Sequence, residues 1–122
     1  MNFYHASDVT DFKIILSKTS RYSFSALFFT ENYNLALLYQ KKNKGCIIKI
    51  ETTSFEKVID YQFKSSYSLD FRNLIYALKK ENLKNILIKN VIDYPSQKNK
   101  VLQHSDILIF FDLKSIPNFT IL

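Results

Sequence analysis

The sequence is poor in glycine, proline, cysteine and histidine, and it contains no tryptophan. The single glycine, Gly45, cannot build the glycine-rich loop that cradles phosphates in many nucleotide-binding proteins. The single cysteine, Cys46, excludes an internal disulfide, and we expect it to pack as a small apolar residue in a strand. Two histidines and one cysteine offer no spacing typical of a metal site, so no metal is expected. The nucleophile elbow of the serine hydrolases is also missing.

The sequence likewise lacks long apolar runs and blocks of like charge. No run is long enough to cross a membrane, and Met1 leads into a strand-like segment rather than a signal peptide. We therefore expect a cytoplasmic protein with no membrane partner. The 17 Lys and Arg residues outnumber the 11 Asp and Glu residues, but they are spread along the chain. The net charge of +6 permits an anionic ligand or partner, although a solvated surface is the simpler explanation.

Aromatic residues, in contrast, are abundant, with 11 Phe and 8 Tyr, and segment 25–40 is organised around them. A dense apolar run over residues 26–29 predicts a buried strand. Thr30 offers a capping hydroxyl, with the acid Glu31 in the first turn of a helix that continues to residue 40. When this helix folds back, the rings of Phe28 and Tyr39 can sandwich a flat ligand, or they can pack as core residues.

The whole pattern predicts one α+β domain over residues 1–122, with a mainly antiparallel sheet or split sandwich and two or three helices. The elements do not alternate as β-α-β, which disfavours a parallel sheet. The other expected strands are residues 2–6, 46–51, 55–60, 86–91, 106–111 and an edge strand at 119–122. Polar loops are expected at residues 17–23 and 93–105, and a short helix or turn at 11–16. The clearest helix is 68–82, capped by Ser68, with an apolar stripe of Leu69, Leu74, Ile75 and Leu78.

Four short stretches resemble, in order, motifs of the ADP-ribosyltransferase family. Residues 3–7, FYHAS, resemble the family's YHGS or YHGT strand, and residues 27–30, LFFT, resemble its IYFA strand. Residues 86–93, ILIKNVID, are similar to the GIIIKNVxD strand of phage-type members. Residues 105–112, SDILIFFD, resemble the NEYIVYD strand that carries the catalytic acid. The set spans nearly the whole chain and implies an ADP-ribosyltransferase-like split antiparallel β-sheet sandwich.

The resemblance implies that the chain binds NAD+ and holds its nicotinamide ring flat. Phe28 stands where the family's first stacking tyrosine lies, and Tyr39 stands where the second lies. The backbone of Ala6, which replaces the family's glycine, would bind the carboxamide. The Ser7 hydroxyl would assist it.

The resemblance also implies residues for the ribose and the phosphates. His5 would hydrogen-bond a ribose hydroxyl and anchor the dinucleotide. Asp106 would stabilise the positive charge that develops on the ribose as the nicotinamide leaves, and it could align or deprotonate the acceptor. Asp112 competes with Asp106 for this role but fits the family's structural aspartate. Arg21 could meet the pyrophosphate.

The expected function is therefore that of an NAD+-dependent mono-ADP-ribosyltransferase acting on a macromolecule, preferably a protein side chain rather than a nucleic-acid base. An aspartate, shorter than the family's glutamate, favours transfer of one ADP-ribose over polymer synthesis. Small phage members that act against CRISPR defence are similar in length and layout, which implies an effector in conflict between phage and bacterium or bacterium and host. Two alternatives stay open: an inactive member that binds protein or nucleic acid, and an NAD+ glycohydrolase.

Overall fold

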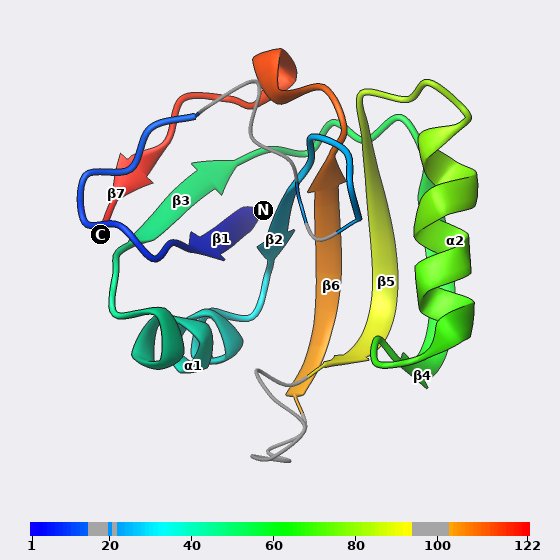
Figure 1. Ribbon diagram of the computed structural model, residues 1–122, viewed down its shortest axis with the longest axis horizontal. Helices are drawn as coiled ribbons and strands as arrows, with labels where there is room; N and C mark the ends of the chain where they lie inside the picture. Colours follow the sequence, from blue (N-terminus) through cyan, green and yellow to red (C-terminus); the bar gives the residue numbers. More distant parts are fainter. Residues whose placement is uncertain (15–19, 21, 94–102) are drawn as a thin grey trace.

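The computed structural model describes residues 1–14, 20, 22–93 and 103–122, which form one seven-stranded sheet and two α-helices (Figure 1). The α+β class expected from the sequence is confirmed. The helices are α1 (Tyr33–Asn43) and α2 (Leu69–Lys79), and neither of these two described helices is long and apolar enough to cross a membrane. The strands are β1 (Asn2–Ala6), β2 (Leu27–Thr30), β3 (Ile47–Glu51), β4 (Val58–Ser65), β5 (Asn85–Asp93), β6 (Gln103–Phe110) and β7 (Thr120–Ile121), and a short 3-10 helix, η1 (Leu113–Ser115), follows β6.

The sheet has the strand order β4-β5-β6-β2-β1-β3-β7 and is antiparallel except between β4 and β5. The mainly antiparallel sheet is thus confirmed. The sheet contains one β-α-β unit that was not expected, because β4, α2 and β5 follow one another and β4 runs parallel to β5. β4 is also longer than the expected strand at 55–60. The full length of β4 could not be recognised from its polar residues. They occur there because β4 lies at the edge of the sheet, where most of its side chains are exposed.

The narrowest join in the sheet lies between β1 and β2. β1 pairs with β3 from Asn2↔Glu51 to Ala6↔Ile47, but it pairs with β2 only at Tyr4↔Thr30. Figure 1 shows β1, β3 and β7 at a steep angle to β2, β6 and β5. The expected split sandwich is therefore a single hydrogen-bonded sheet whose two groups of strands diverge at this joint.

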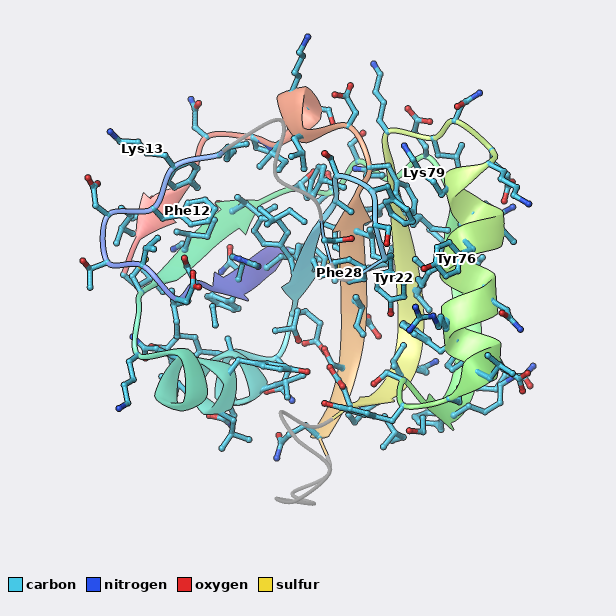
Figure 2. The ribbon with its side chains drawn as sticks, in the orientation of Figure 1. Phe12, Lys13, Tyr22, Phe28, Tyr76 and Lys79 are labelled. Atoms are coloured by element: carbon cyan, nitrogen blue, oxygen red, sulfur yellow. The ribbon has the colours of Figure 1, made fainter. Side chains whose placement is uncertain are left out.

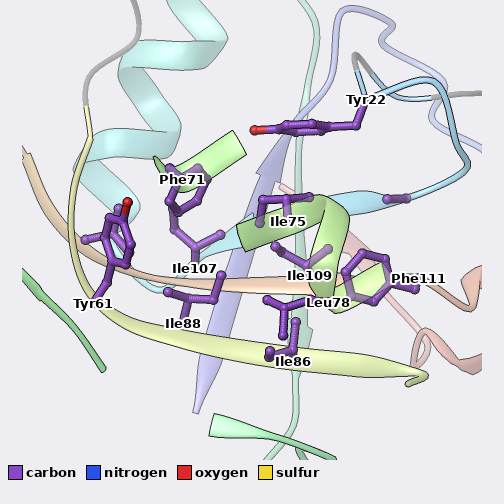
Figure 3. Close-up of a cluster of buried hydrophobic side chains, with 12 residues drawn as sticks. Tyr22, Tyr61, Phe71, Ile75, Leu78, Ile86, Ile88, Ile107, Ile109 and Phe111 are labelled. Atoms are coloured by element: carbon purple, nitrogen blue, oxygen red, sulfur yellow. The ribbon is translucent and has the colours of Figure 1, made fainter. Parts of the chain in front are cut away.

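Two apolar clusters pack on the two faces of the β5–β6 region. Neighbouring residues of a strand point to opposite faces, so Ile107 and Ile109 of β6 join one cluster, and Leu108 and Phe110 join the other. The helix-side cluster (Figure 3) comprises Tyr22, Ala26, Tyr61, Phe71, Ile75, Leu78, Ile86, Ile88, Val91, Ile107, Ile109 and Phe111. The strand-side cluster comprises Phe3, Phe29, Cys46, Ile48, Ile50, Leu87, Leu108 and Phe110, which confirms the apolar packing expected for Cys46.

α2 begins where the sequence predicts. Ser68 is the N-cap, and its hydroxyl accepts the N–H of Phe71 at 3.1 Å. The buried residues are Phe71, Ile75 and Leu78, spaced along one helix face. Leu69 was expected in this stripe but is 71% exposed, because it precedes Phe71 by two positions and lies on the opposite side of the helix.

α1 begins later than predicted. Its N-cap is Asn32, whose side chain accepts the N–H of Leu35 at 3.2 Å. Thr30, the expected cap, belongs to β2 and accepts the N–H of Asn32 through its hydroxyl at 3.0 Å. Glu31 therefore precedes the helix, and the first turn carries no acid. Because Thr30 pairs with Ile107 in the sheet, Asn32 and not Thr30 caps α1.

Two loop boundaries also differ from the predictions. Residues 11–14 of the expected short helix are not helical, and residues 15–16 lie outside the described part. The expected loop over 93–105 is shorter at both ends, because Asp93↔Gln103 and Ile92↔His104 extend the β5–β6 ladder.

Candidate functional site

A cavity of about 820 Å³ opens where β1 and β2 separate. Its walls come from β1, β2, α1 and residues 8–14, and Ser66, Asp93 and Ile107 also line it. The volume lies within the range of roughly 300–1,000 Å³ that is typical of small-molecule sites. The narrow β1–β2 joint thus leaves room for a ligand within the sheet.

The backbone of Ala6 faces this gap. Ser7 donates its N–H to the Cys46 carbonyl (2.8 Å) and Met1 accepts the N–H of Thr52 (3.0 Å), so alternate residues of β1 bond to β3. In an antiparallel ladder the residues between them turn their N–H and C=O groups the other way. Those groups of Ala6 therefore point toward β2, which has already separated from β1 at this position. A carboxamide of a ligand has one acceptor and one donor group, so it can bind the N–H and the C=O of Ala6 at the same time.

His5 spans the gap between β1 and β2. Its Nδ1 lies 2.7 Å from the carbonyl oxygen of Phe28. Because a carbonyl oxygen only accepts, Nδ1 donates the hydrogen of this bond. The rings of Phe12 and Phe29 flank the imidazole, each with a centroid distance of 5.6 Å. The protein thus fixes the position of the His5 ring between β1 and β2.

Ser7 lines the cavity as a buried residue. Its hydroxyl oxygen accepts the N–H of Val9 at 3.2 Å, which leaves the hydroxyl hydrogen as a donor. Gly45 packs directly against Ser7, and a Cβ on Gly45 would lie 1.8 Å from the Ser7 carbonyl oxygen. The glycine therefore permits a close backbone approach that sets the position of Ser7.

Phe28 also lines the cavity, and the ring of Tyr22 stacks on it with a centroid distance of 5.5 Å and an interplanar angle of 20°. Tyr22 contacts Tyr76 of α2 edge-on at 5.7 Å, and Figure 2 shows Tyr22 between Phe28 and Tyr76. A flat ligand would therefore meet an aromatic surface that is already held in place. Tyr22 was expected only as part of a polar loop, although the aromatic residues at 22, 24 and 28 indicate a possible ring cluster.

Replacing Tyr22 with alanine should raise the dissociation constant for NAD+, the ligand that the sequence resemblance implies, by about three- to tenfold, because Phe28 loses its stacked neighbour. The constant is measured by titration at a temperature where circular dichroism shows the variant folded. Tyr22→Phe is the matched control, because it keeps the ring, and its affinity should equal that of the wild type. Unchanged affinity in Tyr22→Ala would show that Phe28 needs no support.

Tyr39 reaches the cavity from α1, and its hydroxyl donates to Oδ2 of Asp93 at 3.0 Å. Ser66 donates to Oδ1 of the same carboxylate at 2.6 Å. Asp93 is buried and lines the cavity, whereas it was expected only as the last residue of the motif at 86–93 and the first of the following loop, with no functional role. The signal that could have identified it is an acid at the end of an apolar strand.

The structure does not bring Asp106 into this cavity. Its neighbour Ile107 lines the cavity, so the side chain of Asp106 points to the other face of β6. There Oδ1 of Asp106 accepts the N–H of Asn90 at 3.0 Å. Asp112, the rival acid, caps η1 by accepting the N–H of Lys114 at 3.1 Å. Neither acid occupies the position that a cavity carboxylate requires.

Two backbone irregularities lie in β4 and β5, in the strands on the Asp106 side of the sheet. Gln62, Phe63 and Asn90 have φ values of 56°, 59° and 59°, and both strand registers shift near them. Asp60 accepts hydrogen bonds from the backbone N–H of Gln62 (2.8 Å) and the side chain of Asn90 (3.1 Å). Both hydrogen bonds lower the pKa of the Asp60 carboxyl, and the bond from the backbone N–H of Gln62 has the larger effect. Asp106 therefore belongs to a polar network that supports two adjacent bulges.

Charged groups around the cavity are mixed. Lys13 is the one lysine or arginine among the described lining residues, where it lies with the acids Asp8, Asp11 and Asp93. Arg21, expected to meet a pyrophosphate, lies outside the described residues. In the described ranges no three His, Cys, Asp or Glu side chains are grouped so that they could hold a metal ion.

No protein-family model, curated protein or solved structure matches the chain. The functional interpretation thus depends on the cavity and on the four motifs of the sequence. Of the residues predicted to bind or act on NAD+, the structure brings together His5, Ala6, Ser7, Phe28 and Tyr39.

Proposed function

We propose that the chain is an NAD+-dependent mono-ADP-ribosyltransferase that modifies a macromolecular acceptor, in the first place a protein side chain. One observation carries the proposal: His5, Ala6, Ser7, Phe28 and Tyr39, which the sequence resemblance assigns to NAD+, line one cavity. They come from β1, from β2 and from α1, so no single local pattern brings them together.

The cavity offers a separate partner for each part of NAD+. Phe28, backed by Tyr22, presents a flat surface to the nicotinamide ring. The N–H and C=O of Ala6 match the acceptor and donor of the carboxamide. Nε2 of His5 accepts from a ribose hydroxyl, and Lys13 supplies a cation for the pyrophosphate. This set of partners favours a nicotinamide dinucleotide over a free base or a sugar.

The reaction breaks the bond between the nicotinamide nitrogen and C1′ of the ribose. The electron pair leaves with the nicotinamide, which becomes neutral, and C1′ gains oxocarbenium character. A nucleophilic atom of the acceptor bonds to C1′ and releases its proton to solvent. Water in the place of the acceptor gives NAD+ glycohydrolase activity.

Binding without catalysis is the second candidate function, and the position of Asp106 favours it. The resemblance assigns the catalytic acid to Asp106, whose side chain lies on the other face of β6 from the cavity. Such a protein would bind protein or nucleic acid through its basic surface. A role in conflict between phage and bacterium or bacterium and host, for example against a CRISPR complex, rests on the resemblance alone and applies to both candidates.

One assay with labelled NAD+ and cell extract separates these functions. Transfer predicts label on a macromolecule, hydrolysis predicts free ADP-ribose, and binding of a protein or nucleic acid without catalysis predicts neither product and no release of nicotinamide. Phe28→Ala should lower nicotinamide release by about tenfold, because the ring surface is lost. Phe63→Ala is the matched control, since Phe63 is 60% exposed and does not line the cavity. A wild-type protein that shows neither stabilisation by NAD+ nor release of nicotinamide would contradict the proposal.

A further inference from the structure

One buried carboxylate lines the cavity, that of Asp93 at the end of β5. It is 8% exposed, whereas the other lining acids, Asp8 and Asp11, are exposed. A charged group in such a buried place needs hydrogen-bond donors around it. The surroundings of Asp93 supply such donors, so the protein holds this carboxylate in a fixed position in the cavity wall.

Two hydroxyls from different parts of the fold hold Asp93. Tyr39 of α1 donates to Oδ2 at 3.0 Å, and Ser66, which follows β4, donates to Oδ1 at 2.6 Å. Tyr39 itself lines the cavity, so its ring and the charge of Asp93 are fixed relative to each other.

Asp106 lacks this relation to the cavity. Its Oδ1 accepts the Asn90 N–H beside the bulge in β5, and its own N–H donates to the Glu31 carboxylate at 3.1 Å. A carboxylate stabilises a developing cation best when it lies in the same site as that cation. Of the two aspartates, Asp93 is the buried one and the one that lines the cavity.

We propose that Asp93, rather than Asp106, is the catalytic carboxylate of the transferase, an inference that rests on the proposed function. As the C1′–nitrogen bond breaks and nicotinamide leaves with the electron pair, the negative charge of Asp93 stabilises the oxocarbenium ion. Asp93 forms no covalent bond. The acceptor atom bonds to C1′ and its proton goes to solvent, so no proton is transferred to or from Asp93 in the step. Tyr39 is a positioning residue that orients the carboxylate through Oδ2.

The test compares Asp93→Asn with Asp106→Asn, two substitutions of equal size and equal loss of charge. The hydroxyls of Ser66 and Tyr39 can rotate to suit an amide, so Asp93→Asn keeps the shape of the cavity. The kcat for nicotinamide release should fall roughly 10²–10³-fold in Asp93→Asn, while the dissociation constant for NAD+ changes less than about threefold. The loss in Asp106→Asn should be at least about tenfold smaller. Tyr39→Phe, which keeps the charge, should lower kcat by about three- to tenfold.

The outcomes separate this inference from the proposed function. If the wild-type protein neither binds NAD+ nor releases nicotinamide, both the proposed function and the assignment of Asp93 are contradicted. An active wild type with an equally active Asp93→Asn, or with an equal loss in Asp106→Asn, overturns the assignment of Asp93 alone. If Asp93→Asn melts below the assay temperature, Asp93→Glu and Asp106→Glu make the same comparison, because each keeps its charge and moves it by one methylene. Equal kcat values in these two variants likewise overturn the assignment.

Discussion

Gly45→Ala should lower the free energy of unfolding by about 3 kcal/mol or more. The new Cβ would lie 1.8 Å from the Ser7 carbonyl oxygen and 2.7 Å from the Asp8 carbonyl carbon. Both neighbours are backbone atoms, so no rotation of a side chain relieves the clash. The segments must move apart, which breaks the bonds from Ser7 N–H to Cys46 C=O (2.8 Å) and from Cys46 N–H to Val9 C=O (3.2 Å). The affinity for NAD+ should also fall in Gly45→Ala, because Ser7 and Val9, which would be displaced, line the cavity.

Urea unfolding and a melting curve with and without NAD+ measure this effect. Lys44→Gly is the matched control one residue earlier. Lys44 ends α1 with φ 58°, a conformation that glycine adopts without strain, so the free energy of unfolding should change by less than about 1 kcal/mol. An alanine variant as stable as the wild type would show that β1 and the turn before β3 do not approach so closely.

His5→Ala should lower kcat/KM for nicotinamide release by about 10²–10³-fold. The substitution removes the hydrogen bond to the Phe28 carbonyl, which links β1 and β2 beside their one residue pair, Tyr4↔Thr30. It also removes Nε2, the proposed acceptor for a ribose hydroxyl. His5→Asn separates these two losses. Its amide nitrogen can replace Nδ1 as the donor to Phe28 but offers nothing at the position of Nε2. We expect His5→Asn to keep the melting temperature of the wild type and to lose activity nearly as far as His5→Ala.

The other histidine supplies the control. His104 is exposed, does not line the cavity, and contacts Asn90 through Nε2 at 3.1 Å. His104→Ala should change kcat/KM by less than about twofold, since no cavity group depends on it. Full activity in His5→Asn would show that Nε2 has no part in the reaction.

Much of the fold could be predicted where local chemistry decides the structure. β1 covers the expected residues 2–6, and Ser68 caps α2, because strand alternation and capping depend on a few neighbouring residues. β4 could not be predicted at its full length. Its pairing with β5 depends on a crossover through α2, and its edge position permits polar side chains that carry no strand pattern.

The candidate site shows the same limit. The residues on β1 and β2 were predicted together because the motifs there are contiguous, and they do line one cavity. The acid was harder to predict, because neighbouring positions in a strand face opposite sides of the sheet. A resemblance identified the strand of Asp106 but not the face on which its side chain lies. Asp93 could not be linked to Tyr39 and Ser66, since these residues come from separate elements.

The pairing of β2 with β6 also determines when during synthesis the cavity can form. β1 and β3 are nearer in sequence than β2 and β6, because Ala6 pairs with Ile47 whereas Leu27 of β2 pairs with Phe110 of β6. Contacts of such separation form late, because a long loop must close first. Ile107 of β6 also lines the cavity, so a nascent chain that lacks β6 has an incomplete site. The cavity is therefore complete only after the C-terminal part of the chain has been made.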